Sequence, residues 1–599
     1  MSMDRHVEEN HPEVAPKHTT EETLTPLRVA ILRNISTEVF ESELTKQAKA
    51  SGFSLDIDLG TFDNIVQDAL SPSPGLIRTE TNAIAVFLHL EQISSNICNR
   101  LIGMSSGELE AEINRIVSII DMVSDALRKR SSAPIIWASF ETMETNALGA
   151  GDLSQRDGLR QTVLHLNNKL IQLTESVPNF YLLDTVAILM KLGRDDFYDQ
   201  RLWNLMSLPY SMKAMREISR DFTSLMRSLL GKQRKCVVVD CDETLWGGIV
   251  GEDGFSGLTI SPNATGKVFF DFQRALVNLH DRGVLVALAS KNNPEDVWEV
   301  FDKRPDMPLR KEHVVASRIN WQDKTSNLRD LAASLNLGLD SFVFIDDSEF
   351  EIDLVRHILP EVACILVDAS NPGGHARQLA DSRHFDTLSV TEQDRKRTAS
   401  YKAEERRIEI RNSTESLTGY LKSLGMNLEI KRASTDTLNR LSQLTMRTNQ
   451  FNLTTKRYSE RDIAALSESS SHELLQISLT DRFGEYGIIG TAILAHEPFA
   501  TTVDNFLLSC RALGRGVEYA AFADICKRAK LQGMETLKST YIATKKNQQT
   551  EDFYLRAGMK LECETEGKKE FTLDLNFAIK SQEDQHLAIH SDAQSKEDT

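Results

Sequence analysis

Two acidic residues, Asp240 and Asp242, follow a short apolar run and carry the strongest chemical signal in the chain. The run at 237–239 is β-branched, which predicts a buried strand ending at Asp240. In open α/β sheets, ligands collect beyond the carboxyl ends of the strands. Two carboxylates at such an end suit nucleophilic attack, proton transfer and Mg²⁺ binding. A solvated turn with incidental acids has the same short pattern, so this stretch alone leaves both interpretations open.

Three later segments place polar residues at comparable points. Ser290 ends the apolar run LVALA, and Asp346 and Asp347 follow the apolar run FVFI. Lys324 lies between them, at the start of a predicted amphipathic helix. The combined order is strand-Asp-x-Asp-x-Thr, strand-Ser, Lys, and strand-Asp-Asp. This order favours the chemical interpretation over an incidental turn.

The four segments together resemble the motifs of the haloacid dehalogenase (HAD) superfamily, whose members are mostly Mg²⁺-dependent phosphotransferases. The resemblance implies that Asp240 attacks phosphorus to form an aspartyl phosphate, and that Asp242 serves as general acid and then as general base. It also implies that Ser290 and Lys324 hold the phosphoryl oxygens.

The same resemblance implies a Mg²⁺ site. Asp346, Asp240 and the main-chain carbonyl of Asp242 would ligate the ion, a hard cation that prefers oxygen. Asp347 would act as a ligand through water or would orient Lys324. The sequence departs from the pattern after Asp347, where it reads SEFEI instead of Asn-Pro-x-Glu-Arg. This difference leaves the metal carboxylates in place but changes their surroundings.

Further stretches resemble the FkbH-like branch of this superfamily: LWGG, GEDG, NWQDK, NQFNLTTKRY, DRFGEYGIIG and SCRALGRGVE. They lie between about residues 235 and 575. FkbH-like proteins load a glyceryl unit from 1,3-bisphosphoglycerate onto an acyl carrier protein for polyketide and related pathways. The resemblance therefore implies this activity and these partners. The residues alone indicate only Mg²⁺-dependent phosphoryl chemistry.

The C-terminal part resembles a GNAT acyltransferase. A predicted strand is followed by Arg511, Gly514, Arg515 and Gly516 in the pattern Arg-x-x-Gly-x-Gly, which opens an amphipathic helix. Glycines let the backbone approach a pyrophosphate, whose charge suits a helix N-terminus. We favour binding of acyl-CoA, or of the phosphopantetheine of a carrier protein, over a purely structural turn.

Three more residues belong to this predicted acyl site. The resemblance implies that Asn547 and Tyr554 line the thioester end of the ligand. Cys510 directly precedes the Arg-x-x-Gly-x-Gly loop. A helix N-terminus and Arg511 would lower the pKa of its thiol and suit it to carry an acyl group. A buried structural cysteine is an equally good interpretation.

Composition limits the remaining possibilities. The chain has 599 residues, an apolar fraction of 41% and a net charge of −18. This charge argues against non-specific binding to nucleic acid or to a membrane surface. The seven cysteines show no CxxC pair, which predicts reduced thiols and a cytoplasmic protein. No apolar run reaches membrane-spanning length.

An N-terminal α/β region precedes the HAD motifs. FkbH-like proteins often carry an SGNH-hydrolase-like domain here, and Ser36 follows the first predicted strand, where a hydrolase nucleophile would lie. The Gly-Asp-Ser context is missing, and His89 falls within a predicted strand. Asp195 and Asp196 have no suitably placed late histidine. We therefore favour an inactive scaffold over an esterase.

The sequence thus predicts a multidomain α/β protein. Its parts are a disordered leader (1–26), a degenerate SGNH-like domain (27–230), a HAD domain with a Rossmannoid parallel sheet (233–367), a connector (368–414), a GNAT-like α+β domain (415–575) and a disordered tail (576–599). Three alternatives to glyceryl loading remain open: a plain phosphatase acting on a small metabolite, an acyltransferase with the HAD domain as scaffold, and a non-catalytic assembly protein of a biosynthetic cluster.

Overall fold

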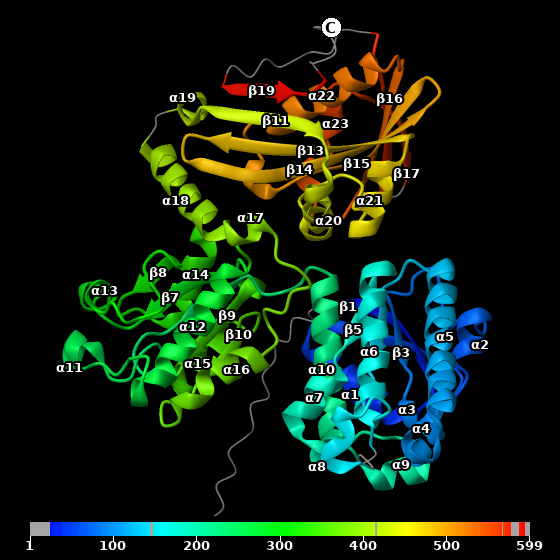
Figure 1. The fold of residues 1–599 in the computed structure, drawn as a ribbon. Helices are drawn as coiled ribbons and strands as arrows, with labels where there is room; N and C mark the ends of the chain where they lie inside the picture. The colour runs from blue at the N-terminus through cyan, green and yellow to red at the C-terminus, as the bar shows by residue number, and fades with distance from the viewer. Residues whose placement is uncertain are drawn as a thin grey trace, which may run out of the picture. The chain divides into compact units, whose positions relative to one another are not determined.

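The structure is a computed structural model that describes residues 24–143, 148–413, 416–544, 546–565, 567–576 and 586–593. The chain divides into two compact units, Met1–Thr223 and Ser224–Thr599. Figure 1 follows the chain through both. The N-terminal unit contains one sheet, and the C-terminal unit contains two.

The sheet of the N-terminal unit is parallel throughout, in the order β2-β1-β3-β4-β5. Its inner strands β3 and β4 are wholly apolar and buried, as expected where helices cover a parallel sheet, whereas the edge strand β2 carries polar residues. The strands are β1 (Thr25–Arg33), β2 (Phe53–Leu59), β3 (Ala83–Phe87), β4 (Ile135–Ala138) and β5 (Phe180–Leu183).

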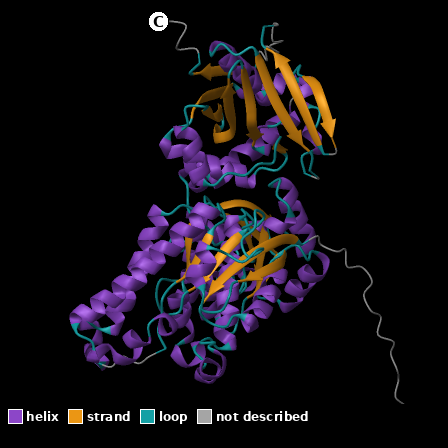
Figure 2. Ribbon diagram, turned by 90° about the vertical axis from the view of Figure 1, so that its right-hand side faces the viewer, coloured by secondary structure: helices purple, strands orange, loops and turns teal. Residues whose placement is uncertain are grey.

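Helices alternate with these strands, as the sequence predicts (Figures 1 and 2). The longest, α5, starts with a capping box in which Ser105 and Glu108 satisfy free backbone donors. The helices are α1 (Glu38–Ala50), α2 (Ile65–Leu70), α3 (Leu90–Ile93), α4 (Ser95–Arg100), α5 (Ser106–Arg130), α6 (Leu159–Ser176), α7 (Thr185–Leu192), α8 (Arg194–Phe197), α9 (Gln200–Met206) and α10 (Met212–Leu229), which crosses into the second unit.

The first sheet of the C-terminal unit carries the HAD-like segments. It is also parallel, in the order β10-β9-β6-β7-β8, so the carboxyl ends of all five strands lie at one edge. Strand β6 pairs with β7 on one side and with β9 on the other. The strands are β6 (Cys236–Val239), β7 (Leu285–Ser290), β8 (Val314–Ile319), β9 (Phe342–Asp346) and β10 (Ala363–Leu366).

Helices accompany this sheet and the connector that follows it. The insert after β6 contains the short helix α11 (Val250–Gly257). The others are α12 (Lys267–Asp281), α13 (Pro294–Lys303), α14 (Lys324–Ser334), α15 (Glu349–Ile358), α16 (His375–Asp381), α17 (Glu392–Arg395) and α18 (Arg397–Ser413). Helix α14 begins at Lys324, as predicted, with the side chain of Asp323 accepting from the Ser326 amide as its N-cap.

The last sheet is mostly antiparallel, in the order β17-β18-β16-β15-β14-β13-β11-β19. Its strands are β11 (Met426–Arg432), β12 (Phe451–Asn452), β13 (His472–Asp481), β14 (Gly484–Glu497), β15 (Ala500–Leu508), β16 (Thr536–Ile542), β17 (Lys560–Thr565), β18 (Lys568–Asp574) and β19 (Leu587–Ser591). The helices are α19 (Leu417–Leu424), α20 (Leu438–Arg447), α21 (Glu460–Glu468), α22 (Val517–Leu531) and α23 (Phe553–Arg556).

Strands β15 and β16 pair in parallel only at their beginnings, from Ala500 to Val503 on β15. Beyond that point, the backbone of Leu453 lies between the two strands. The Leu453 amide donates to the Phe506 carbonyl (3.2 Å), and the Ile542 amide donates to the Leu453 carbonyl (2.8 Å). The fold therefore closes this gap with backbone hydrogen bonds.

Both predicted disordered ends need correction. Strand β1 begins at Thr25, inside the predicted leader, and residues 1–23 lie outside the described part. The predicted tail contains β19, which pairs in parallel with β11. Arg528 holds this strand through Ser591 (3.0 Å) and Asp592. An open edge of β11 offers unpaired backbone groups, and β19 satisfies them.

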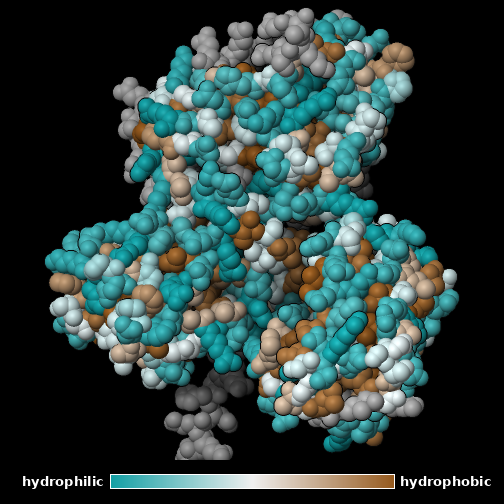
Figure 3. Space-filling view, viewed as in Figure 1, coloured by the Kyte–Doolittle hydropathy of each residue, from teal (hydrophilic) through white to brown (hydrophobic). Residues whose placement is uncertain are grey.

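The surface view in Figure 3 shows a largely hydrophilic face broken by apolar areas. Among the described helices, none is both long enough and apolar enough to cross a membrane.

Candidate active site

Lys324 lies between two acids at the carboxyl edge of the second sheet. Its Nζ contacts Asp240 Oδ1, and lies 3.2 Å from Asp346 Oδ2 and 2.6 Å from the Ala289 carbonyl. Burial disfavours the charged ammonium, but the carboxylates of Asp240 and Asp346 outweigh burial and raise the pKa of Lys324 above its usual range. The ammonium thus remains charged and offsets the clustered acids.

The carboxylate of Asp242 is fixed by three donors. Its Oδ1 accepts from Trp246 Nε1 (2.9 Å) and from the Val250 amide (3.1 Å), and its Oδ2 accepts from Asn292 Nδ2 (2.9 Å). Trp246 and Val250 belong to the insert after β6, so this insert orients the second acid of the motif. A carboxylate held in one orientation is suited to proton transfer at a defined atom.

Ser290 ends β7 and is buried, and β7 pairs with β6, the strand that precedes Asp240. The amide of Asn292, which binds Asp242, also donates to Ser290 Oγ (3.0 Å). Asn292 therefore connects the predicted proton donor to the predicted phosphoryl-binding hydroxyl. Asn292 was not predicted from the sequence, although its place two residues after the strand-ending serine is a usable signal.

Three carboxylates form a candidate Mg²⁺ site. Oxygen atoms of Asp240, Asp346 and Asp347 lie within 4.8 Å of one another. Burial, opposed by Lys324, raises the pKa of Asp346 to about 7, and burial and Asp240 raise the pKa of Asp347 to about 6. The buried Oδ2 of Asp346 also lacks a well-aligned hydrogen bond. An all-oxygen cluster with unsatisfied negative charge fits Mg²⁺.

The side chain of Asp242 lies outside this carboxylate cluster, because both of its oxygens accept hydrogen bonds from other residues. This agrees with the prediction that Asp242 would reach the metal through its main-chain carbonyl, which stays a prediction. Asp347 also accepts from Thr244 Oγ1 (3.5 Å). The structure thus brings Asp240, Asp242, Ser290, Lys324, Asp346 and Asp347 to one edge of one sheet.

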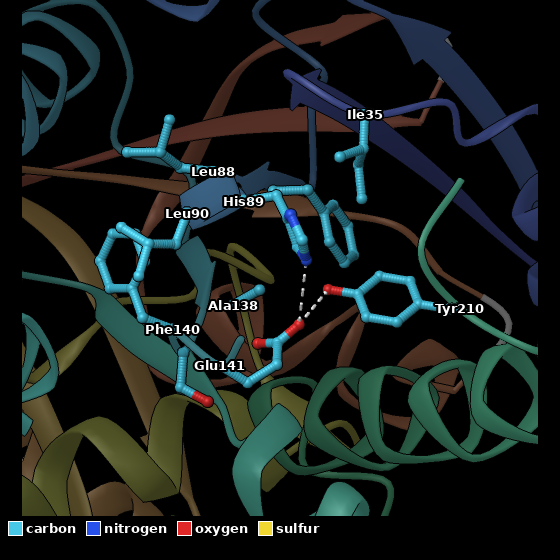
Figure 4. Close-up of a pocket in the computed structure, with 10 residues that line it drawn as sticks. Ile35, Leu88, His89, Leu90, Ala138, Phe140, Glu141 and Tyr210 are labelled. Carbon is cyan, nitrogen blue, oxygen red and sulfur yellow. Dashed lines mark hydrogen bonds and ion pairs between the residues drawn. The ribbon is translucent and has the colours of Figure 1, made fainter. Parts of the chain in front are cut away.

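A second cluster lies at the carboxyl edge of the N-terminal sheet. Figure 4 shows the His89 ring and the Tyr210 hydroxyl pointing toward the carboxylate of Glu141. Tyr210 donates to Glu141 Oε1 (2.7 Å), and His89 Nε2 lies 3.8 Å from the same oxygen. On the other side, His89 Nδ1 lies 3.1 Å from Glu91 Oε2. The adjoining cavity, about 10 Å³, has room for roughly one water.

The predicted hydrolase residues do not meet in this cavity. Ser36 does not line it, and its hydroxyl donates to the Met206 carbonyl. Asp196 is exposed and pairs with Lys213 (2.7 Å). The expectation that His89 lies within a strand is wrong, because β3 ends at Phe87 and His89 precedes α3. The preference for a scaffold over an esterase stays a prediction.

The predicted phosphate loop of the last domain has the expected backbone shape. Gly514 and Gly516 adopt φ of 72° and 80°, values that favour glycine, and α22 begins directly after them. However, the Gly514 amide donates to Glu518 Oε1 (3.3 Å), and the Arg515 guanidinium lies 5.1 Å from the centre of the Tyr486 ring. A carboxylate of the protein thus already contacts an amide that a phosphate would use.

Asn547 and Tyr554 are both buried. Asn547 Nδ2 donates to the carbonyls of Asn452 (3.1 Å) and Ile542 (2.9 Å), and its Oδ1 accepts from the Thr544 amide (2.7 Å). Its amide therefore holds backbone segments together in this conformation. The side chain of Cys510 lies outside the described part of the structure, so its predicted role stays a prediction. The same holds for the ligand-binding roles of Asn547 and Tyr554.

A protein family matches most of the N-terminal part of the chain. Residues 28–226 match the sequence model of the family described as FkbH, N-terminal domain. This part of the chain is thus similar to that family. The match confirms the FkbH resemblance, and the SGNH-like character of the FkbH domain stays a prediction. A search of curated proteins found no match.

Solved structures add fold information. The N-terminal part of BF1531 from Bacteroides fragilis, described as containing a phosphatase domain complexed with Mg, is 23% identical with a TM-score of 0.56. It covers 61% of this chain and 96% of that chain, more than the FkbH domain alone can account for. The ribosomal-protein-S18-alanine N-acetyltransferase of Escherichia coli covers 26% of this chain and 97% of its own, at 16% identity and a TM-score of 0.21.

Proposed function

We propose that this protein is a Mg²⁺-dependent phosphatase coupled to acyl transfer, which takes a glyceryl unit from 1,3-bisphosphoglycerate and loads it onto the phosphopantetheine thiol of an acyl carrier protein. The observation that carries the phosphatase part is the buried group of Asp240, Lys324 and Asp346, with Asp242 oriented beside it. The carrier, the substrate and the acyl step rest on the FkbH resemblance.

The phosphatase chemistry follows from the positions of the two acids. Asp240 attacks the phosphorus of the C3 phosphate ester, and the bond from phosphorus to the departing alkoxide breaks. Asp242, held by Trp246 and Asn292, protonates that alkoxide. Asp242 then takes a proton from water, which hydrolyses the aspartyl phosphate and releases inorganic phosphate. Bound Mg²⁺ would supply charge neutralisation for the phosphoryl oxygens.

The acyl step breaks the other phosphate linkage. A thiolate attacks the C1 carbonyl of 1,3-bisphosphoglycerate, and the C1 phosphate leaves as the carbon–sulfur bond forms. The thiol belongs to the carrier, or first to Cys510 and then to the carrier. Each transfer exchanges one acyl bond for another and needs no oxidant or reductant. The proposal places this step in the last domain.

A plain phosphatase is the second candidate. It is favoured by the contrast between the assembled Asp240 site and the last domain, where Asn547 is already hydrogen-bonded to backbone and Gly514 contacts Glu518. A plain phosphatase would release phosphate from small esters and would leave the carrier unmodified.

The deciding experiment is the intact mass of a holo-carrier protein after incubation with the enzyme, Mg²⁺ and freshly generated 1,3-bisphosphoglycerate. We expect a glyceryl mass gain with native enzyme. Asp240→Asn should yield a phosphoglyceryl gain or none, because the C3 ester then stays intact. Asp271→Asn, at a partly exposed acid on α12 that pairs with Lys267, is the matched control and should behave as native.

Two outcomes would contradict parts of the proposal. An undiminished glyceryl gain with Asp240→Asn would remove this carboxylate from the phosphorus chemistry. Release of phosphate from simple esters without any carrier modification would replace glyceryl loading with the plain phosphatase. Loss of carrier loading with Cys510→Ala, while ester hydrolysis persists, would support the route through an enzyme thiol.

A further inference from the structure

Trp321 is an exposed aromatic residue held in one orientation. It lies in the loop between β8 and α14 and is 71% exposed. Its indole Nε1 nevertheless donates to Asn293 Oδ1 (3.1 Å), and Asn293 Nδ2 in turn donates to Asp296 Oδ2 (3.0 Å). A large apolar ring that is fixed but left in water is ready to contact a ligand without first losing side-chain entropy.

The two ends of this hydrogen bond adjoin the phosphoryl-binding residues. Asn293 follows Asn292, whose amide contacts Asp242 and Ser290. On the other side, the backbone amide of Asn320 donates to the Ser290 carbonyl (3.0 Å). Lys324, the residue that contacts Asp240, follows three positions after Trp321. The loops that follow β7 and β8 thus carry both the Trp321–Asn293 hydrogen bond and residues of the candidate active site.

Other exposed apolar side chains occur in the segments that follow strands at the same edge of the sheet. Ile249, in the insert after β6, is 42% exposed, and Phe350, at the start of α15 after β9, is 70% exposed. Because β6, β8 and β9 run parallel in one sheet, the loops after them share its carboxyl edge. An ionic centre is therefore bordered by loops that present apolar groups. This combination suits a ligand with a phosphoryl head and a carbon body.

We propose that Trp321 is a specificity-determining residue that packs its indole against the carbon body of a phosphorylated substrate, and that Asn293 positions the ring. The substrate class would be phosphate esters whose body reaches from the phosphoryl group to the loop that bears Trp321. A one-carbon ester, too short to reach that loop, would leave the ring unused. The inference rests on the proposed phosphoryl chemistry at Asp240.

The test is the dissociation constant of phosphonates, which are not hydrolysed, measured by calorimetry on the full chain with Mg²⁺. The probes are methylphosphonate and phenylalkylphosphonates of increasing chain length. With native protein we expect affinity to rise along the series. Trp321→Ala should weaken the best phenylalkyl ligand about tenfold, the scale of one aromatic contact, and change methylphosphonate by less than about twofold.

Variants separate contact from general damage. Trp321→Phe should restore most of the affinity because it keeps a ring. Asn293→Asp, which keeps an acceptor for the indole N–H, should bind better than Asn293→Ala. Phe62→Ala, at another exposed aromatic residue, should match native protein.

The inference is overturned if Trp321→Ala leaves the phenylalkyl ligands unchanged or weakens methylphosphonate equally. Phosphate release from acetyl phosphate, measured on the same samples, tests the proposed function separately. Native protein that binds the series as expected but releases no phosphate would contradict the phosphatase and not the role of Trp321. Failure of native protein to bind any phosphonate would contradict the role of Trp321, and phosphate release would then decide the proposed function alone.

Discussion

The ammonium of Lys324 lies 3.2 Å from the carboxylate of Asp346, and both side chains are almost fully buried. Removing one partner of a buried ion pair leaves the other charge uncompensated. Lys324→Met should therefore lower the free energy of unfolding by about 3–5 kcal/mol. It should also abolish measurable phosphate release. Calorimetric unfolding of the full chain and a phosphate-release assay would measure the two effects.

Added Mg²⁺ should recover part of the stability of Lys324→Met, because the ion would neutralise the same carboxylates. Lys267→Met is the matched control, since the side chain of Lys267 is 54% exposed and pairs with the partly exposed Asp271. Surface pairs of this kind contribute about 0–1 kcal/mol. Equal destabilisation by the two substitutions would contradict the importance of the buried pair.

Asp323 precedes Lys324 and caps helix α14. Hydrogen bonds from Thr325 and Ser326 lower the pKa of Asp323 to about 2. A lowered carboxyl pKa stabilises the fold above the usual value of 3.8 and loses that effect as pH falls toward 2. The cap is therefore fully formed at neutral pH. Asp323→Ala should lower the free energy of unfolding by about 0.5–2 kcal/mol and reduce phosphate release by loosening Lys324.

Asp323→Asn separates the cap from the charge. Asparagine caps helices about as well as aspartate, so this variant should stay close to native in melting temperature and activity. Equal losses in the alanine and asparagine variants would show that charge, and not the cap, matters at this position.

Glu518 contacts the amide of Gly514 at the start of α22. A diphosphate would compete with this carboxylate for the same positive helix end. Glu518→Gln should therefore tighten the binding of coenzyme A about threefold to tenfold, measured by equilibrium dialysis. Glu497→Gln, an exposed acid on β14, should have no effect. Unchanged affinity in both variants would argue that diphosphate does not bind at this loop.

The grouping of polar residues that directly follow strands was predictable from the sequence, because apolar runs followed by acids mark the carboxyl edge of a parallel sheet. Asp240, Ser290 and Asp346 meet for this reason. The hydrogen bonds made by the loops were not predictable. No apolar periodicity indicates that Trp246 and Val250 orient Asp242, that Glu518 accepts from the Gly514 amide, or that Leu453 bridges β15 and β16. Strand β19 was missed because a short strand in polar sequence gains its stability from the edge of β11.

Glu141 should give the N-terminal unit a measurable pH dependence. Burial raises the pKa of Glu141 above its usual 4.5, although His89, Thr185 and Tyr210 favour the ionised form. The folded state therefore holds this proton to higher pH than the unfolded state. Its stability should fall as pH rises above about 4.5, until the carboxyl has ionised in the fold as well.

Glu141→Gln cannot ionise, so its free energy of unfolding should fall less than that of native protein over this range. Pulse-labelling hydrogen exchange during denaturant titrations, followed in peptides that contain β4 and α7, would measure the difference in the full chain. Glu175→Gln, at an exposed site on α6, should follow the native curve. Parallel curves for native protein and Glu141→Gln would show that Glu141 is already ionised throughout.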